Sequence, residues 1–352
     1  MREVLALDLS KLSLRTALIG TIVLGVTVVL VGVYGNVAIA AGLAAVFVIA
    51  AGPADTRRPD LGSVLLVAIG AVVTFLVSVS ASSPAWAAVV ITVITLAATL
   101  LAMLDQRSAK MGVYGLLWAV LVLDVGATAD TAVSMAIAFA FGGVLAVLAL
   151  WISYRFLESD PDPEADADVG KDAAETTIRT RHQRDVIARF AIVRAAGAGA
   201  CVLLGYSLFP ENPAWAVLTF VLVIQPPAHQ FVVTALGRAL GTAVGVVVGV
   251  LIIQISTGDT VALLVAFVAS AFLMIATRKV NYAVSTLFTT SVLLISQALL
   301  QEQTSVAAWQ RLLATLLGVV IAFAVVAVLA LLTGRHRHAK AEAEPTDPDS
   351  PS

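Results

Sequence analysis

The sequence predicts an all-α polytopic membrane protein with about twelve transmembrane helices, arranged as two parallel six-helix repeats. Hydrophobic residues make up 60% of the 352-residue chain and charged residues only 12%, whereas charged residues are about a quarter of a typical soluble domain. Mean hydropathy is +0.98. Several apolar runs reach the length of about 20 residues that is needed to cross a bilayer.

The apolar runs fall into two sets of six. The first set covers residues 14–33, 37–52, 61–79, 85–104, 111–128 and 131–155. The second set covers residues 190–209, 214–226, 237–256, 260–277, 282–300 and 307–333. The runs 37–52 and 214–226 are short for a full crossing, so a tilted, re-entrant or half-buried course stays open for both.

Lysine and arginine residues gather on alternate connections between these runs, and Arg311 is the one cation near the other side. Because cytoplasmic loops carry an excess of positive charge, both termini and the central linker are expected in the cytoplasm.

The two halves of the sequence also resemble each other. Arg15 opens the first run as Arg194 opens the seventh, and at the same spacing Gly20 corresponds to Gly199. Since each half starts on the same side, the repeat is parallel.

Five segments follow from this reading of the chain. Residues 1–13 are expected to form an amphipathic lead-in helix on the membrane surface, before the first membrane repeat at 14–156. A cytoplasmic linker at 157–189 is acidic and proline-containing at first, which indicates disorder, and then basic, which suits anionic lipid headgroups. The second membrane repeat covers 190–333, and a disordered cytoplasmic tail covers 334–352.

Glycine recurs at every fourth position in the run 237–256, at Gly237, Gly241, Gly245 and Gly249. Small residues at this spacing allow two membrane helices to approach closely, so the four residues, here called the glycine stripe, are assigned to helix packing. Gly318 in the last run is given the same role. A helix that lines or gates a pore is the functional alternative for the glycine stripe.

Two arginines are candidate substrate-binding residues. Arg238 lies near the cytoplasmic end of its run, where it either snorkels to headgroups or marks the mouth of an anion path. Arg311 lies just inside the outer edge of the last run, against the sidedness of the other cations. Its guanidinium could hold a carboxylate through two hydrogen bonds. A salt bridge from Arg311 to Glu302 or Asp259 is the structural alternative.

The eleventh run is unusually polar. Asn281, Ser285 and Thr289 recur at near-helical spacing, and these three residues are predicted to line a substrate path. Hydroxyl groups in membrane helices can also bond back to their own helix, so a packing role is the alternative. Asp124, the deepest acidic residue, is the one candidate for proton coupling.

No site of another kind is expected. Cys201 is the only cysteine, and its place in an apolar run indicates a core residue. The four histidines form no cluster with cysteine or aspartate, and no phosphate-binding loop is present. The sequence therefore predicts no metal, no cofactor and no enzymatic activity. A net charge of −2 gives no indication of nucleic acid binding.

The motifs GRALGTAVGVVVGVLI at 237–252 and RLLATLLGVVIAF at 311–323, together with the six-plus-six arrangement, resemble the fusaric acid resistance family of integral membrane proteins. Aromatic carboxylic acid exporters and, more distantly, plant aluminium-activated malate transporters are relatives. The arginine and glycines of the first motif match Arg238, Gly241, Gly245 and Gly249, and those of the second match Arg311 and Gly318. The short linker differs from the large soluble region of many members, so an envelope-spanning pump is not expected.

The resemblance implies a transporter or channel that exports small organic anions, in particular aromatic carboxylates, through a path between the two repeats. It also implies a multi-pass protein of the bacterial inner (plasma) membrane. The alternative function is a non-transporting scaffold, in which basic cytoplasmic segments bind anionic lipid or a partner protein. The expected partners are the lipid bilayer, anionic headgroups and a small organic anion. Assembly into a homo-oligomer stays open.

Overall fold

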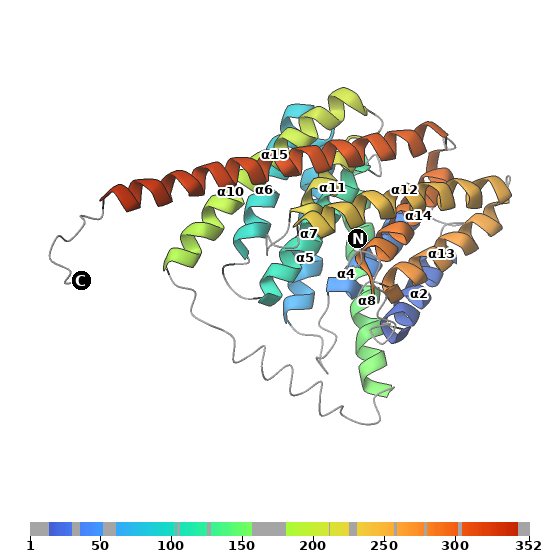
Figure 1. Ribbon diagram of the computed structural model, residues 1–352. Coiled ribbons are helices and arrows are strands. Elements are labelled where there is room, and N and C mark those ends of the chain that lie inside the picture. Colours follow the sequence, from blue (N-terminus) through green and yellow to red (C-terminus); the bar gives the residue numbers. More distant parts are fainter. Residues whose placement is uncertain are drawn as a thin grey trace.

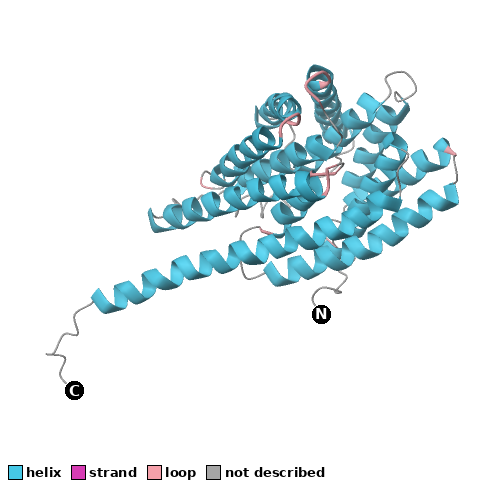
Figure 2. Cartoon of the chain, turned by 90° about the horizontal axis from the view of Figure 1, so that it is seen from above, coloured by secondary structure: helices cyan, strands magenta, loops and turns pink. Residues whose placement is uncertain are grey.

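Helices make up nearly all of the chain that can be described. The computed structural model describes residues 14–29, 36–51, 61–101, 103, 106–124, 128–156, 181–210, 212–224, 231–256, 259–277, 280–301 and 305–343. Within these ranges the chain forms twelve α-helices and no β-strand (Figure 2). The predicted lead-in helix at 1–13 lies outside the described residues.

The helices fall at the predicted runs, with one set before the central linker in the chain and one set after it. The first half comprises α2 (Leu14–Val29), α4 (Asn36–Ala51), α5 (Leu61–Ser80), α6 (Pro84–Leu101), α7 (Gln106–Asp124) and α8 (Ala132–Phe156). The second half comprises α10 (Arg181–Leu208), α11 (Ala214–Val223), α12 (Phe231–Ser256), α13 (Thr260–Thr277), α14 (Tyr282–Gln301) and α15 (Ser305–Ala343).

Helices α10 and α15 extend furthest beyond the boundaries expected from hydropathy. Helix α10 begins at Arg181, so the basic end of the linker, expected to precede the helix up to residue 189, is its first turns. Helix α15 continues to Ala343, ten residues into the segment expected to be a disordered tail, and its end projects away from the bundle (Figure 1). Hydropathy detects only the membrane part of a helix, because its polar continuation carries no apolar signal.

Seven of the described helices are long and apolar enough to cross a membrane: α6, α8, α10, α12, α13, α14 and α15. Shorter apolar stretches occur in α2, α5, α7 and α11. Helix α11 has only ten residues, which corresponds to about 15 Å at the usual rise per residue. The chain is therefore a polytopic helical membrane protein, and the short run expected at 214–226 forms a helix about half as long as the bilayer core is thick.

Helix pairs that pack in the first half recur in the second half in the same chain order. Helix α2 packs on α4, α4 on α8, α5 on α7 and α8, and α6 on α7. The corresponding pairs also pack: α10 on α11, α11 on α15, α12 on α14 and α15, and α13 on α14. Between the halves, α6 packs on α10 and α2 packs on α13, and these two contacts correspond to each other.

Glycines allow close approach at corresponding places. A Cβ atom built on Gly142 of α8 would overlap the carbonyl oxygen of Ala41 on α4. A Cβ atom on Gly318 of α15 would lie 2.5 Å from the carbonyl oxygen of Ala216 on α11. Each glycine therefore lets the last helix of its half touch the backbone of the second helix, as small residues do in membrane bundles.

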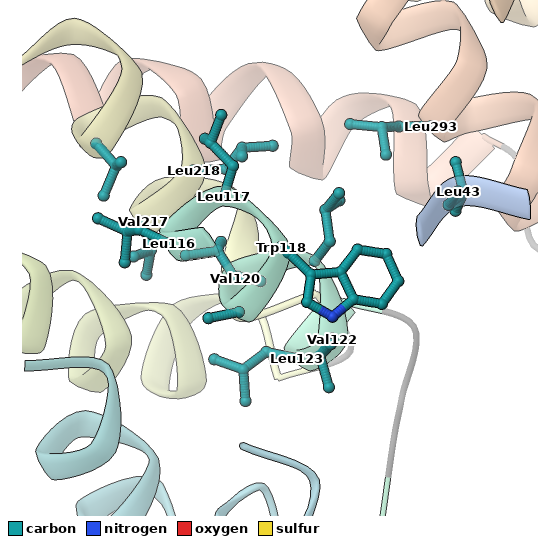
Figure 3. Packing of buried hydrophobic residues seen from close by; sticks show 14 of the residues in the cluster. Leu43, Leu116, Leu117, Trp118, Val120, Val122, Leu123, Val217, Leu218 and Leu293 are labelled. Atoms are coloured by element: carbon teal, nitrogen blue, oxygen red, sulfur yellow. The ribbon is translucent and has the colours of Figure 1, made fainter. Parts of the chain in front are cut away.

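The middle of the interface between the halves is apolar. Leu116, Leu117 and Val120 of α7 lie close to Val217 and Leu218 of α11 (Figure 3). All of these side chains are buried. Since α7 belongs to the first half and α11 to the second, tight apolar packing closes this part of the boundary between them.

We expect Gly142→Ala and Gly318→Ala each to lower the free energy of unfolding by about 1–3 kcal/mol, because the new methyl group meets a backbone oxygen that cannot move aside. Gly115→Ala in α7 is the matched control, since no atom lies within 4 Å of its added Cβ. Thermal unfolding of the purified protein in detergent measures the effect. Equal melting temperatures for all three variants would contradict the close helix contacts.

Candidate functional site

Three arginines are buried in the second half, on three different helices. The exposed fractions are 2% for Arg194 on α10, 1% for Arg238 on α12 and 0% for Arg311 on α15. An isolated charge inside a membrane helix is unfavourable by about 2.5–3.5 kcal/mol on insertion scales. The surroundings of each guanidinium therefore show how its charge is stabilised.

Arg194 joins the two halves and caps a helix. Its Nη1 donates to the Thr99 hydroxyl of α6 at 3.0 Å, and its Nη2 donates to the Val221 carbonyl oxygen at 3.0 Å. Val221 lies in the last turn of α11, where carbonyl groups have no partner within the helix and the helix dipole is negative. Arg194 is thus stabilised by the end of the short helix, and its role is structural.

A second polar group surrounds the start of α11. We call it the Arg311 cluster: Asn212, Trp215, Gln297, Gln310 and Arg311. The Asn212 amide accepts a hydrogen bond from Gln297 Nε2 of α14 at 2.7 Å and donates to Gln310 Oε1 of α15 at 2.8 Å. These two hydrogen bonds connect the start of α11 to α14 and α15.

Arg311 lies over the ring of Trp215, with its guanidinium carbon 5.0 Å from the ring centroid. A cation at this distance from an indole is attracted to the face of the ring. Both side chains are completely buried, and within the described part of the chain the indole N–H of Trp215 has no hydrogen-bond partner. The cluster therefore places a cation and an unused N–H donor beside the first turn of α11.

A third polar group lies between α12 and α14. We call it the Arg238 cluster: Arg238, Thr242, Tyr282, Thr286 and Thr290. The guanidinium of Arg238 is in electrostatic contact with the Tyr282 hydroxyl, which also contacts Thr286. No carboxylate contributes to the surroundings of Arg238 among the described residues, and its Nε and Nη2 have no hydrogen-bond partner. With 1% of its surface exposed, Arg238 does not reach the protein surface as a snorkelling side chain would.

The glycine stripe lies against α14 next to this cluster. A Cβ atom on Gly237 would lie 3.1 Å from the Tyr282 ring. Added Cβ atoms on Gly241 and Gly245 would each lie 2.8 Å from a threonine Cβ, of Thr286 and Thr290 respectively. On Gly249 an added Cβ would lie 3.1 Å from Leu294. The stripe therefore lets α12 and α14 run in close backbone contact, and this contact surrounds Arg238 with α14 side chains.

The predicted path-lining residues of α14 make local contacts instead. Asn281 accepts hydrogen bonds from the backbone N–H groups of Ala283 and Val284, as a helix N-cap does. Ser285 donates to the Met274 carbonyl oxygen of α13 at 3.4 Å. Thr289 donates to the Ser285 carbonyl oxygen of its own helix. Of these predicted residues, Ser285 thus faces α13, whereas the neighbouring Thr286 and Thr290 face α12.

Two acidic residues from the sequence analysis can also be placed. Asp124 is the last residue of α7, and its side chain lies outside the described part, so proton coupling stays a prediction. Asp259 is exposed and accepts hydrogen bonds from the backbone N–H groups of Val261 and Ala262 at the start of α13. Glu302, the other alternative partner of Arg311, lies outside the described residues.

The Arg238 and Arg311 clusters lie at different levels of α14. Arg238 meets α14 at its first residue, Tyr282, whereas the Arg311 cluster includes Gln297, four turns further along the helix. The two arginines therefore do not form one binding site. Asn212, Trp215 and Thr242 were not predicted as site residues, because a single polar or aromatic residue within an apolar run gives no sign of its partners.

The fold and these clusters define the class of protein: a polytopic helical membrane protein with buried arginines in its second half. Residues 199–325 match the family described as fusaric acid resistance protein-like. This match supports the resemblance drawn from the sequence, and it includes both Arg238 and Arg311. Residues 199–325 are thus similar to fusaric acid resistance proteins, and with the apolar helices this similarity suggests a membrane protein of the transporter type. Comparisons with curated proteins and with solved structures gave no match.

We expect Arg194→Leu to lower the free energy of unfolding by about 1–3 kcal/mol, because the Val221 carbonyl group loses its buried donor. Thr99→Val removes only one of the two hydrogen bonds and should have a smaller effect. Arg189→Leu, at an exposed position of the same helix, is the control. Chemical or thermal unfolding in detergent measures these values, and an Arg194→Leu protein as stable as the Arg189→Leu protein would contradict the capping role.

Proposed function

We propose that this protein transports small organic anions across the membrane, with aromatic carboxylates as the preferred class. The observation that carries the proposal is Arg238. It is a buried cation inside a membrane-crossing helix, it has no carboxylate in its described surroundings, and two of its nitrogens have no partner. A transported anion would supply the missing charge and the missing acceptors.

Arg311 supports the same function from another level of the bundle. It is completely buried over the Trp215 ring, beside the start of the half-length helix α11. Discontinuous helices whose N-termini face a cavity are a recurring device for binding anionic groups in transporters. Two cations at successive levels would make successive positions for an anion that moves along the second half.

The pairing of helices supports a second part of the proposal, two parallel six-helix repeats related by a pseudo-two-fold axis. Corresponding helices pack on each other in both halves. If α2 corresponds to α10 and α6 to α13, then the α2–α13 contact corresponds to the α6–α10 contact, and both are present. Gly142 and Gly318 make matching close contacts. Under this arrangement all twelve helices count as spans, and both termini lie on the cytoplasmic side of a bacterial inner membrane. The expected path between the repeats stays a prediction.

A membrane potential can drive such transport without a coupling ion. An inside-negative potential favours the exit of an anion by about 2.3 kcal/mol per charge per 100 mV. An exporter of monovalent carboxylates would therefore work as a uniporter or channel. Proton exchange through Asp124 is the alternative mode of coupling.

A lipid-binding scaffold is the alternative function. Arg189, in the first turns of α10, is exposed, and exposed basic residues at a cytoplasmic helix end suit anionic headgroups. A scaffold, however, gives no reason to bury Arg238 and Arg311, because headgroup contact needs arginines at the surface.

We expect purified protein in liposomes to release radiolabelled benzoate when an inside-negative potential is imposed, and to release neutral benzamide no faster than protein-free liposomes. Arg311→Ala should lower benzoate flux about tenfold or more, since a charge-assisted interaction contributes roughly 1.5–3 kcal/mol. Arg189→Ala is the control for loss of one positive charge. Absence of flux for benzoate, acetate and malate with folded protein would favour the scaffold.

A further inference from the structure

The threonine side chains show where the helix bundle contains buried polar groups that have no hydrogen-bond partner. Most buried or half-buried threonines here donate to a carbonyl oxygen of their own helix, as is usual in membrane helices. Thr21, Thr74, Thr92, Thr99, Thr289 and Thr315 all do so. Among the residues that the structure describes, four buried threonine hydroxyls have no partner: Thr95, Thr219, Thr242 and Thr290. Three of these four lie in the second half, and two of the three belong to the Arg238 cluster.

Thr242 and Thr290 are held close to Arg238 by helix packing. Thr242 is one turn from Arg238 on α12, and both have 0–1% of their surface exposed. Thr290 is one turn from Thr286, which contacts the Tyr282 hydroxyl beside Arg238. The 2.8 Å approach of Thr290 Cβ to a Cβ built on Gly245 places Thr290 directly against α12. The polar groups of Arg238, Thr242 and Thr290 that have no partner therefore lie along the interface between α12 and α14.

The two unpartnered nitrogens of Arg238 are Nε and Nη2. These atoms lie on the same edge of the planar guanidinium, so their N–H bonds run side by side. Such an edge matches the two oxygens of one carboxylate and forms a bidentate pair. A water molecule or a single carbonyl oxygen can accept from both donors only through bent, shared hydrogen bonds, whereas a carboxylate offers each donor its own oxygen. The unused groups of Arg238 thus fit a carboxylate better than they fit another acceptor.

In the corresponding helix pair of the first half, each buried hydroxyl group described on α5 donates to a carbonyl oxygen of its own helix. There α5 packs on α7, and the Trp118 indole N–H donates to the Thr74 hydroxyl at 2.7 Å. The Trp118 ring also contacts Phe139, with ring centroids 4.7 Å apart. The Trp118 N–H and the Thr74 hydroxyl therefore have partners within the protein, and aromatic rings pack beside them.

We propose that the interface of α12 and α14 holds a binding site for one monovalent carboxylate. The Nε–Nη2 edge of Arg238 binds the carboxylate, and the hydroxyl groups of Thr242 and Thr290 donate to the ligand as it lies along the interface. This inference rests on the proposed function and deepens it, since it assigns the binding groups to the second half alone. One guanidinium without a second cation in the cluster selects a single negative charge.

Equilibrium binding of radiolabelled benzoate to purified protein in detergent tests the site. Arg238→Lys keeps the charge and removes the two-nitrogen edge, so Kd should rise about tenfold or more. The double variant Thr242→Val, Thr290→Val removes hydroxyls that have no protein partner, so Kd should rise about fivefold while the melting temperature stays the same or rises. The matched control is Thr21→Val, Thr277→Val, whose hydroxyls bond within their own helices.

Benzamide, which has the same shape as benzoate without its charge, should not compete at a hundredfold excess. The site is overturned if benzoate binds and its Kd is the same in wild-type protein and the double threonine variant, or if benzamide competes as well as benzoate. It is also overturned if folded wild-type protein binds none of benzoate, acetate and chloride. Flux that depends on Arg311 while both Arg238-cluster variants bind benzoate normally would refute this site, and the proposed function would then rest on Arg311.

Discussion

A guanidinium group buried among membrane helices needs either an anion or enough hydrogen-bond acceptors, and the second half of this chain satisfies that need in three ways. Arg194 finds acceptors in the Thr99 hydroxyl and in the free carbonyl end of α11. Arg311 lies over the Trp215 ring. Arg238 keeps two nitrogens without a partner. The first arginine holds the structure together, and the last has capacity left for a ligand.

Close backbone contact makes this arrangement possible. The glycine stripe brings α12 against α14, so that polar side chains of both helices surround Arg238 where a larger residue would separate them. Corresponding helices of the first half pack in the same pairs, and between α5 and α7 the Trp118 indole donates to the Thr74 hydroxyl while its ring contacts Phe139. The described part of each half contains buried polar groups, and in the second half these include a guanidinium whose Nε and Nη2 have no partner.

Hydropathy predicted the positions of the helices closely. The run 260–277 coincides with α13, and Pro84 begins α6 next to its expected start. The polar beginning of α10 and end of α15 were missed because amphipathic or charged turns carry no apolar signal. Arg238 and Arg311 could be identified because a charge in an apolar run is unusual. Thr242 and Asn212 could not, because only the packing of neighbouring helices decides whether such a group bonds within its own helix, as Thr289 does, or stays free.

The central claim is that the interior of the second half admits anions, and accessibility of Thr242 tests it most directly. Cys201 is the only cysteine and is buried, so Thr242→Cys in a Cys201→Ala background gives a single reporter thiol. We expect a negatively charged methanethiosulfonate reagent to modify this thiol faster than a positively charged one, and benzoate to slow the reaction. Equal rates for both reagents without protection by benzoate, or no reaction in folded protein, would contradict an anion site beside Arg238.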